Sequence, residues 1–306
     1  MKMETKAKIS VVVPVLNRAK LIERSLDSIA AQDVRPLNLY VVDNGSDDGT
    51  QDVVRNWVRR HADDNGLRVT LMEDMQRGAA RARQTALDIV DTEWVYFFDS
   101  DDEMLPGTLS GALDLGDGAD IVWFPIAIVY LDGHVLNKKF RNVNLLRKQV
   151  FNSIFSTQAF ISRTKFFKDA GGWDTALMEW DDWELGMRLL RHNPRAAYLP
   201  ETGVTVYRQA ESITGIDFSS KRGRWEQVID RISADVGADR HLQEMLDYRR
   251  VILAAHYRRE GNREGARRLL DKTLRSTTCS PIRKWLLRLI YIYTAHGGRG
   301  AYLLWR

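Results

Sequence analysis

The sequence predicts an α/β fold in which a mostly parallel sheet is flanked by helices. Over about the first hundred residues, short apolar runs rich in β-branched residues alternate with amphipathic segments of about a dozen residues, which is the pattern of parallel strands joined by helices. Polar clusters follow three of the apolar runs, at Asn17, Asp43 and Asp99–Asp102. Sheets of this kind bind ligands at the carboxyl ends of their strands, so we expect one site beside these clusters.

The first strand is expected at Ile9–Val15, because this run is apolar and β-branched, as in a strand buried on both faces. Leu21, Ile22, Leu26 and Ile29 follow at helical spacing and predict the first helix. The same alternation then predicts strands over 37–43, 68–72 and 94–98 and helices over 50–61 and 78–90.

The rest of the chain predicts a mixed segment followed by helices. Short strands are expected at 121–124, 127–130, 157–161 and 204–207, and one helix near 180–191. After Phe218 the apolar spacing is helical over 242–259, 263–274 and 282–293. We therefore expect an α/β domain over residues 1–218 and a basic helical region over residues 219–306.

Charge is distributed unevenly between these two regions. The chain of 306 residues has a net charge of +4, but residues 219–306 hold 19 Lys and Arg against 9 Asp and Glu, a net charge of +10. Such a surplus indicates either contact with an anionic partner or a basic surface that faces water. The sequence leaves both interpretations open.

Cysteine content and hydropathy restrict the class of protein. A single cysteine, Cys279, excludes an internal disulfide framework and a cysteine-based zinc cluster, and it suits a reducing compartment. Met1 to Lys8 is polar, so we expect no secretory signal. No uninterrupted apolar run approaches the roughly 20 residues that span a bilayer. We expect a cytoplasmic protein, with a peripheral position at the inner membrane face as an open alternative.

Three carboxylates within four residues end the fourth expected strand: Asp99, Asp101 and Asp102. Like charges this close repel one another by several kcal/mol when buried, unless a cation compensates them. Carboxylate oxygens at this density suit Mg²⁺ or Mn²⁺, with phosphate oxygens completing the coordination. The alternative is a solvated acidic turn that caps a helix beginning near Pro106.

Six segments between residues 9 and 208 resemble, in order, motifs of the family 2 glycosyltransferases, which have the GT-A fold. They are 11–29 with its Pro-x-x-Asn turn, 40–50, 76–86, Phe97–Asp102, Gly171–Asp174 and Trp180–Leu185. The resemblance implies that residues 1–218 form a GT-A catalytic domain. It also implies an inverting, metal-dependent transferase that moves a sugar from a nucleotide sugar, typically a UDP-sugar, to a hydroxyl of a glycan or lipid-linked acceptor, as in cell-surface polysaccharide biosynthesis.

The resemblance implies that the nucleotide binds at the carboxyl ends of the first two expected strands. Asp43 would accept a hydrogen bond from the nucleobase, and the turn with Pro14, Val15 and Asn17 would line the nucleoside. Arg83 would lie over the pyrophosphate or pair with the acids of the metal site. Alternatives remain for two of these residues: Asp43 as a turn residue and Arg83 as a surface helix residue.

The acidic motif would hold the metal. By resemblance, Asp101 is the main ligand of Mn²⁺ or Mg²⁺, and Asp99 binds the metal or the ribose. The cation would neutralise the departing nucleoside diphosphate. The segment beginning at Val206 resembles the family's Tyr-Arg run, after which a histidine often follows, and Ala210 stands at about that position. A third protein ligand would then be missing or be supplied by another group.

The second half of the chemistry needs a base, because an acceptor hydroxyl is a weak nucleophile until a carboxylate takes its proton. In the acidic segment Glu179–Glu184, alignment on the family's Glu-Asp pair gives Asp181 the Glu place and Asp182 the Asp place, so Asp182 is the candidate base. Glu179 is the second choice. The alternative is that these acids stabilise the helix dipole, and both roles are compatible.

Weaker expectations concern the sugar and the acceptor. Trp180 is expected as an acceptor platform, although aromatic residues near active sites more often serve packing. Four further residues are expected to contact donor or acceptor: Asp102, Thr157, Gln158 and Arg208. Gln76, Gln84 and Ala86 replace the family's commoner Asn, Asn and Gly, which puts the loop geometry in doubt but not the chemistry.

The basic C-terminal helices lie outside the resemblance. The helix Ile282–Tyr293, with cations beside it, is expected either to rest on an anionic membrane surface or to pack on the catalytic domain or a second subunit of a homodimer. We expect no nucleic-acid partner. Two competing functions remain: a sugar-phosphate nucleotidyltransferase, which would ordinarily need a glycine-rich loop that residues 14–18 lack, and a non-enzymatic polyanion-binding protein.

Overall fold

The structure is a computed structural model that describes residues 6–61, 66–209, 218–219 and 223–305. Its contacts divide the chain into two units, Met1–Leu145 with Ile154–Ala210, and Leu146–Ser153 with Glu211–Arg306. All but the first residue of helix α5 (Leu145–Asn152) therefore belongs to the second unit. The domain boundary expected at residue 218 stays a prediction, since it adjoins segments outside the described residues.

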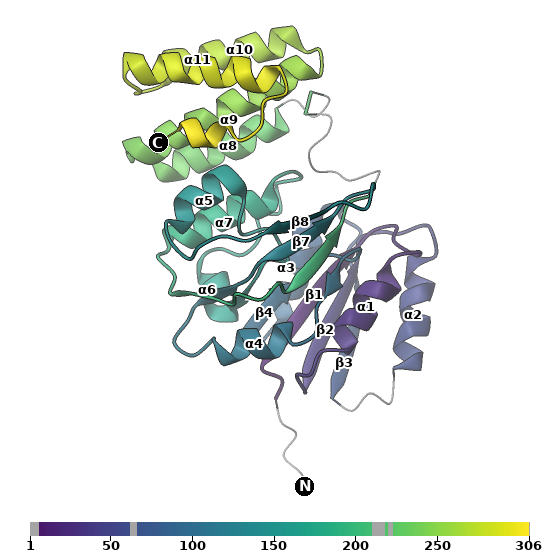
Figure 1. Cartoon of the computed structure of the whole chain (residues 1–306). Coiled ribbons are helices and arrows are strands. Elements are labelled where there is room, and N and C mark those ends of the chain that lie inside the picture. Colours follow the sequence, from purple (N-terminus) through teal and green to yellow (C-terminus); the bar gives the residue numbers. More distant parts are fainter. Residues whose placement is uncertain (1–5, 62–65, 210–217, 220–222, 306) are drawn as a thin grey trace. The chain divides into compact units, whose positions relative to one another are not determined.

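The first unit is built on a sheet that has seven strands among the described residues, in the order β10-β6-β9-β4-β1-β2-β3. Figure 1 shows β4, β1, β2 and β3 side by side in this order. Neighbours are parallel except on both sides of β9. The strands are β1 Ile9–Val15, β2 Leu37–Asp43, β3 Leu67–Glu73, β4 Trp94–Phe97, β6 Ile121–Trp123, β9 Phe160–Arg163 and β10 Ala196–Tyr198. The expected mostly parallel sheet is confirmed.

Helices cover this sheet on both faces, which explains why β1 is apolar at almost every position. Side chains alternate along a strand, and those of Val11, Val13 and Val15 join a core cluster with residues of α1 and α2. Val12 points to the opposite face and is equally buried, and α3 packs on β1 and β2. The helices of this unit are α1 Ile22–Ala30, α2 Thr50–Arg60, α3 Ala79–Ile89, α4 Thr108–Asp114, α6 Thr164–Asp169 and α7 Asp181–Arg191.

A smaller sheet lies beside the acidic motif in the sequence and in space. Its order is β5-β11-β7-β8, and β11 pairs with β7 in parallel and with β5 antiparallel. The strands are β5 Glu103–Met104, β7 Ile126–Val129, β8 Val135–Lys138 and β11 Val204–Tyr207. Because β5 directly follows Asp102, pairing with β11 fixes the carboxyl-terminal side of the acidic motif.

One expected strand begins later than the sequence predicts. The run 157–161 was expected to be extended from its start, but β9 begins at Phe160. The preceding residues form a turn in which Ala159 N donates to Ser156 O at 2.9 Å, and Tyr96 Oη donates to the carbonyl oxygen of Gln158 at 2.9 Å. Tertiary bonds to the turn thus replace ladder bonds over Thr157 and Gln158.

The second unit is helical, as expected for the C-terminal region. Its further helices are α8 Arg224–Val236, α9 Arg240–Arg259, α10 Arg263–Ser276, α11 Pro281–Ala295 and a short 3₁₀ helix, Ala301–Leu304. Side-chain caps define three starts, because Asp239, Asn262 and Ser280 each accept a bond from the backbone N–H three residues later. Among the described residues, no helix has both the length and the apolar character needed to cross a membrane.

Candidate active site

The ends of β1 and β2 lie next to each other and bring Asp43 to the sheet edge. Val15 pairs with Asp43, and Pro14 with Val42. The Asp43 carboxylate is fully buried. Its Oδ2 accepts bonds from Gln51 Nε2 at 2.7 Å and from Ser46 N at 3.2 Å, whereas its Oδ1 is buried and has no hydrogen-bond partner. A buried carboxylate oxygen without a partner is costly unless a ligand donates a hydrogen bond to it.

Asn17 joins the turn after β1 to the turn after β2. Its backbone N–H donates to Ser46 Oγ at 3.0 Å, and its Oδ1 accepts from Asp47 N at 3.0 Å. Asn17 has φ of +52°, a left-handed conformation that asparagine tolerates. The residue therefore shapes the wall beside Asp43 through its backbone and its side chain.

The acidic motif and the start of α7 meet at one guanidinium. Arg83 Nη2 donates to Asp99 Oδ1 at 2.8 Å, and Arg83 Nη1 donates to Asp181 Oδ2 at 2.9 Å. The ring of Trp173 lies 4.6 Å from the guanidinium carbon. Burial lowers the pKa of Arg83, but the charges of Asp99 and Asp181 outweigh it and raise the pKa overall. Of the two alternatives for Arg83, the structure shows pairing with the acids.

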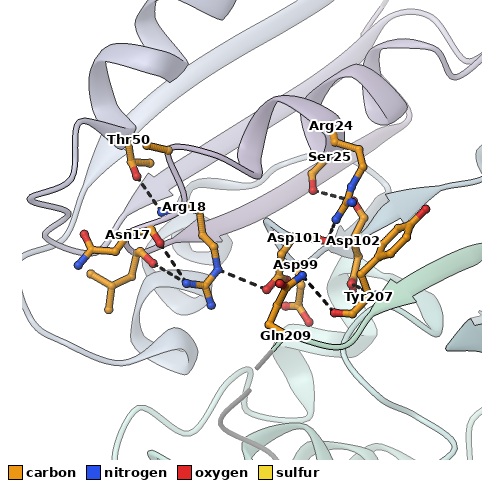
Figure 2. A network of polar contacts seen from close by, with 12 residues as sticks. Asn17, Arg18, Arg24, Ser25, Thr50, Asp99, Asp101, Asp102, Tyr207 and Gln209 are labelled. Carbon is orange, nitrogen blue, oxygen red and sulfur yellow. Dashed lines mark hydrogen bonds and ion pairs between the residues drawn. The ribbon is translucent and has the colours of Figure 1, made fainter. Parts of the chain in front are cut away.

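Asp101 lies on the other side of the motif and pairs with Arg18, which the sequence had not singled out. Figure 2 shows the two side chains pointing toward each other, with Arg18 Nε 3.3 Å from Asp101 Oδ2. Burial raises the pKa of Asp101, and the negative charge of Asp99 raises it further, although Arg18 opposes the shift. Asp99 and Asp101 thus lie close enough to repel each other.

Asp102 is buried and holds three segments together. Its Oδ2 accepts from Gln158 Nε2 at 2.6 Å, and its Oδ1 accepts from Tyr207 N at 3.0 Å. Its carbonyl oxygen accepts from Ser25 Oγ at 2.6 Å. Burial raises the pKa of Asp102 well above its usual value, and the charge of Asp99 adds to the shift. Both carboxylate oxygens are therefore engaged by the protein, as is the side chain of Gln158; Thr157 beside it is buried.

The donor set fits a cation that is shared with a ligand. Among the described residues, no group of three or more His, Cys, Asp and Glu side chains is arranged to hold a metal, and Ala210 lies outside those residues. Asp99 and Asp101, however, are partly accessible and repel each other. Mg²⁺ is commonly held by one or two carboxylates together with substrate phosphates, so these two residues fit such a site.

The start of α7 carries the candidate base. Asp182 Oδ1 accepts from Trp183 N at 2.7 Å. Burial raises the pKa of Asp182 to about 7, and the charge of Asp181 adds to the shift while Arg83 opposes it. A carboxylate with such a pKa can take a proton near neutral pH. Burial also raises the pKa of Asp181. Glu179 is buried one residue before the N-cap, Trp180.

The segment that contains Gly172 and Trp173 is bound to α3 through Gln84. Gln84 is one of the residues that differ from the family's commoner motif. Gln84 Oε1 accepts from Trp173 N at 2.8 Å. Gly172 has φ of +64°, and a Cβ there would lie 2.5 Å from Gln84 Oε1. Any other residue would be strained at this φ and would have to displace the Gln84 amide. The longer glutamine therefore has a defined structural role.

Lys138 lies close enough to Asp182 and to Arg208 for both charges to act on its pKa. Burial lowers the pKa of Lys138 and the Arg208 charge lowers it further, while Asp182 acts in the opposite direction. Arg208 follows β11, and its N–H donates to Val129 O at 2.9 Å. Lys138 ends β8 in a segment without a sequence motif, so only the fold could reveal it.

Four tryptophans are near enough to the sequence motifs to be considered for contact with a sugar: Trp123, Trp173, Trp180 and Trp183. Trp123, Trp173 and Trp183 are buried. Trp180 is partly buried, has φ of +52°, and its ring centroid lies 5.3 Å from that of Trp183. Trp180 stays the candidate for contact with a sugar.

Comparison with known proteins gives a family. The model described as glycosyl transferase family 2 matches residues 10–168, just over half of the chain. A Campylobacter jejuni protein named GalNAc(5)-diNAcBac-PP-undecaprenol beta-1,3-glucosyltransferase is 33% identical over 138 residues, which cover 45% of this chain and 43% of that protein. Glycosyltransferase AglE of Haloferax volcanii is 28% identical over 182 residues, covering 57% and 58%. The chain spans about half the length of these curated relatives.

Solved structures share the fold. S. aureus TarS 1-349 in complex with UDP-GlcNAc has a TM-score of 0.70 at 21% identity, over 94% of this chain and 87% of that chain. Mannosyltransferase PcManGT from Pyrobaculum calidifontis, in complex with GDP-Man and Mn²⁺, has a TM-score of 0.59 at 23% identity, over 95% and 84%. The GT-A fold expected from the sequence is confirmed.

Proposed function

Because the chain belongs to glycosyl transferase family 2, we propose that it transfers a sugar from a UDP-sugar, with inversion, to a hydroxyl of a glycan or lipid-linked acceptor. One observation carries the proposal. Arg83 binds Asp99 of the acidic motif and Asp181 beside the candidate base. The residues suited to a departing diphosphate and those suited to an attacking hydroxyl are therefore adjacent.

The donor's nucleobase would bind at Asp43. Uracil offers an N–H donor, and the buried Oδ1 of Asp43 lacks one. The backbone at Pro14 and Val15 and the turn at Asn17 would form the neighbouring wall. We propose UDP as the nucleoside diphosphate of the donor. The mannosyltransferase in the solved complex binds GDP-Man, so GDP is the alternative that an experiment must exclude.

A divalent cation, Mn²⁺ or Mg²⁺, would be held by Asp101 and Asp99 together with the diphosphate. When bound, it supplies positive charge that stabilises the leaving diphosphate. The repulsion between Asp99 and Asp101, which raises the pKa of Asp101, is the observation that supports a cation here. The solved mannosyltransferase contains Mn²⁺, and GT-A enzymes typically use a divalent metal.

Asp182 would act as the base. The acceptor oxygen attacks the anomeric carbon, the bond between that carbon and the diphosphate oxygen breaks, and the hydroxyl proton passes to the Asp182 carboxylate. Arg83 neutralises Asp99 and Asp181 and so keeps both sides of the site at a fixed separation. Displacement in one step, without an enzyme nucleophile, inverts the anomeric configuration.

The acceptor class that we propose is supported by a relative of known name. The name of the Campylobacter relative describes an acceptor that is linked to undecaprenol through PP, which supports a lipid-linked acceptor. Trp180 would pack against its sugar. Glu179 adjoins Trp180 in the sequence, and Lys138 interacts with the charges of Asp182 and Arg208, so we propose these polar residues as further contacts.

A panel of nucleotide sugars tests this function. The purified protein is incubated with UDP- and GDP-sugars and Mn²⁺, and release of nucleoside diphosphate is measured, because water can slowly replace the acceptor. We expect release from at least one UDP-sugar, loss of release in EDTA, and an inverted product by NMR. If only GDP-sugars react, the assignment of uracil is wrong; if no nucleotide sugar reacts with or without crude glycolipid, the proposed function is wrong.

A further inference from the structure

Helix α11 is apolar on two sides. One side, with Leu287, Ile290 and Thr294, is buried, and α11 packs on α9. This side accounts for the stability of the helix within the second unit, together with Pro281 at its first turn and the cap by Ser280. The apolar residues on the other side are not needed for that packing.

The other side of α11 forms an exposed stripe, which we call the α11 stripe. It consists of Ile282, Trp285, Leu289 and Ile292, whose exposed fractions are 80%, 60%, 38% and 52%. Spacings of three, four and three place these side chains in one line along the helix. Single exposed apolar residues are common, whereas a continuous stripe marks a surface that binds something.

Cations outnumber acids in the last part of the chain, which includes α11. Asp271 is the last acidic residue of the chain, and seven Lys and Arg follow it. A groove of about 390 Å³ runs between α10 and α11, which lie side by side (Figure 1); Leu274, Tyr291 and Ile292 contribute apolar walls, and Arg275 and Arg288 contribute cations against the one carboxylate of Asp271. The groove and the stripe share Ile292 and are therefore continuous.

We propose that the α11 stripe and this groove bind the surface of a bilayer that contains anionic phospholipid, with α11 lying in the plane of the membrane. Tryptophan and aliphatic side chains insert at the boundary between headgroups and acyl chains, and neighbouring cations contact lipid phosphates. A symmetric contact between two copies would instead bring together two surfaces on each of which the cations of Arg275 and Arg288 outnumber the one carboxylate of Asp271. Charge complementarity therefore selects an anionic lipid surface over a second copy.

Vesicle flotation with the full chain tests the proposal and does not depend on the enzymatic activity. We expect binding to vesicles of phosphatidylcholine mixed with phosphatidylglycerol, little binding to pure phosphatidylcholine, and release as salt rises. The double variant Arg275→Gln/Arg288→Gln should bind about 25-fold more weakly, because each cation near an anionic surface contributes about 1 kcal/mol, or about fivefold. Trp285→Ser/Ile292→Ser should lose about tenfold or more.

Matched controls come from the first unit. Leu131→Ser changes an apolar residue that is 72% exposed, and Arg59→Gln removes one exposed cation; neither should change flotation. Circular dichroism of each variant checks that the helices are retained. Equal binding to neutral and anionic vesicles, undiminished binding of both double variants, or a dimer by light scattering that both double variants dissociate without any vesicle binding would each overturn the proposal.

Discussion

Asp99 and Asp181 bind the same guanidinium, although one follows a central strand and the other begins a helix far along the chain. Arg83 donates to the first at 2.8 Å and to the second at 2.9 Å, and its side chain is only 7% exposed. The contact couples the acidic motif to α7. We therefore expect the stability of the first unit and the proposed chemistry to depend on the same residue, Arg83.

Replacing Arg83 with methionine should lower the free energy of unfolding of the first unit by about 3–5 kcal/mol, because two carboxylates lose their shared partner. Arg83 opposes the raised pKa of Asp181, so this pKa should rise further in the variant and the native state should take up a proton as pH falls. The loss in free energy of unfolding, relative to the unchanged protein, should thus be smaller at about pH 5 than at about pH 8. Urea unfolding of both proteins at both pH values measures this loss. Arg81→Met, on the same helix but 40% exposed and paired with Asp74, should cost less than about 1 kcal/mol.

Asp182→Asn should lower kcat for sugar transfer by about 10²–10⁴, because general-base catalysis contributes about that factor. The KM for the donor should change little, since the amide keeps the size of the carboxyl. Steady-state kinetics with the donor identified by the panel measures both. Asp114→Asn, at an exposed position of α4, is the matched control. A variant at Asp182 that retains near-full kcat would assign the base to another residue, with Glu179 the first to examine.

The rate should depend on pH with a rising limb near 7. Asp182, whose pKa is raised to about 7, must be ionised to accept a proton, so kcat/KM should rise with pH up to about 7 and then level off. Asp181→Asn removes a charge that raises the pKa of Asp182 and should move the limb to lower pH. A pH profile of both proteins checks this. An unshifted limb in Asp181→Asn would mean that another group titrates.

Asp43→Asn should weaken UDP binding by about 10- to 100-fold, because a hydrogen bond to a charged group contributes about 1.5–3 kcal/mol. The amide keeps one acceptor oxygen, which can serve either the bonds from Ser46 and Gln51 or the nucleobase, but not both. Calorimetric titration with UDP measures the loss. Asp47→Asn, an exposed neighbour, should bind UDP normally, and equal affinities in the two variants would contradict a nucleobase contact at Asp43.

Asp101→Asn should raise the Mn²⁺ concentration for half-maximal activity by about tenfold or more, because a carboxylate ligand is lost. Arg18→Gln should act in the opposite direction, since Arg18 pairs with Asp101 at 3.3 Å and competes with the cation. Manganese titration at saturating donor separates the two effects. Unchanged metal dependence in Asp101→Asn would remove this residue from the metal site.

Part of the site could be found from local patterns. Asp43 and Asp99–Asp102 follow buried strands, and parallel strands carry such residues to one edge of a sheet. Arg83, by contrast, could be interpreted as a residue of the site or as a surface residue of a helix. The spacing of residues in a helix predicts the side of the helix on which a residue lies, but not the residue that it contacts. Arg18 lies in the segment 11–29 without an assigned role, and Lys138 lies outside the six segments. Only their positions in the fold relate them to Asp101 and Asp182.

The sequence by itself determined the alternation of strands and helices and the approximate place of the acidic motif, because these depend on side-chain periodicity over short segments. The GT-A fold was implied by the resemblance of its motifs to a known family. Tertiary structure decided which charges meet: that Arg83 joins Asp99 to Asp181, that Asp102 is enclosed by Gln158 and Tyr207, and that α11 leaves one apolar side exposed. These relationships depend on distances and burial between residues remote in the chain, which no local pattern records. Electrostatic energies follow those distances and the loss of water around each group.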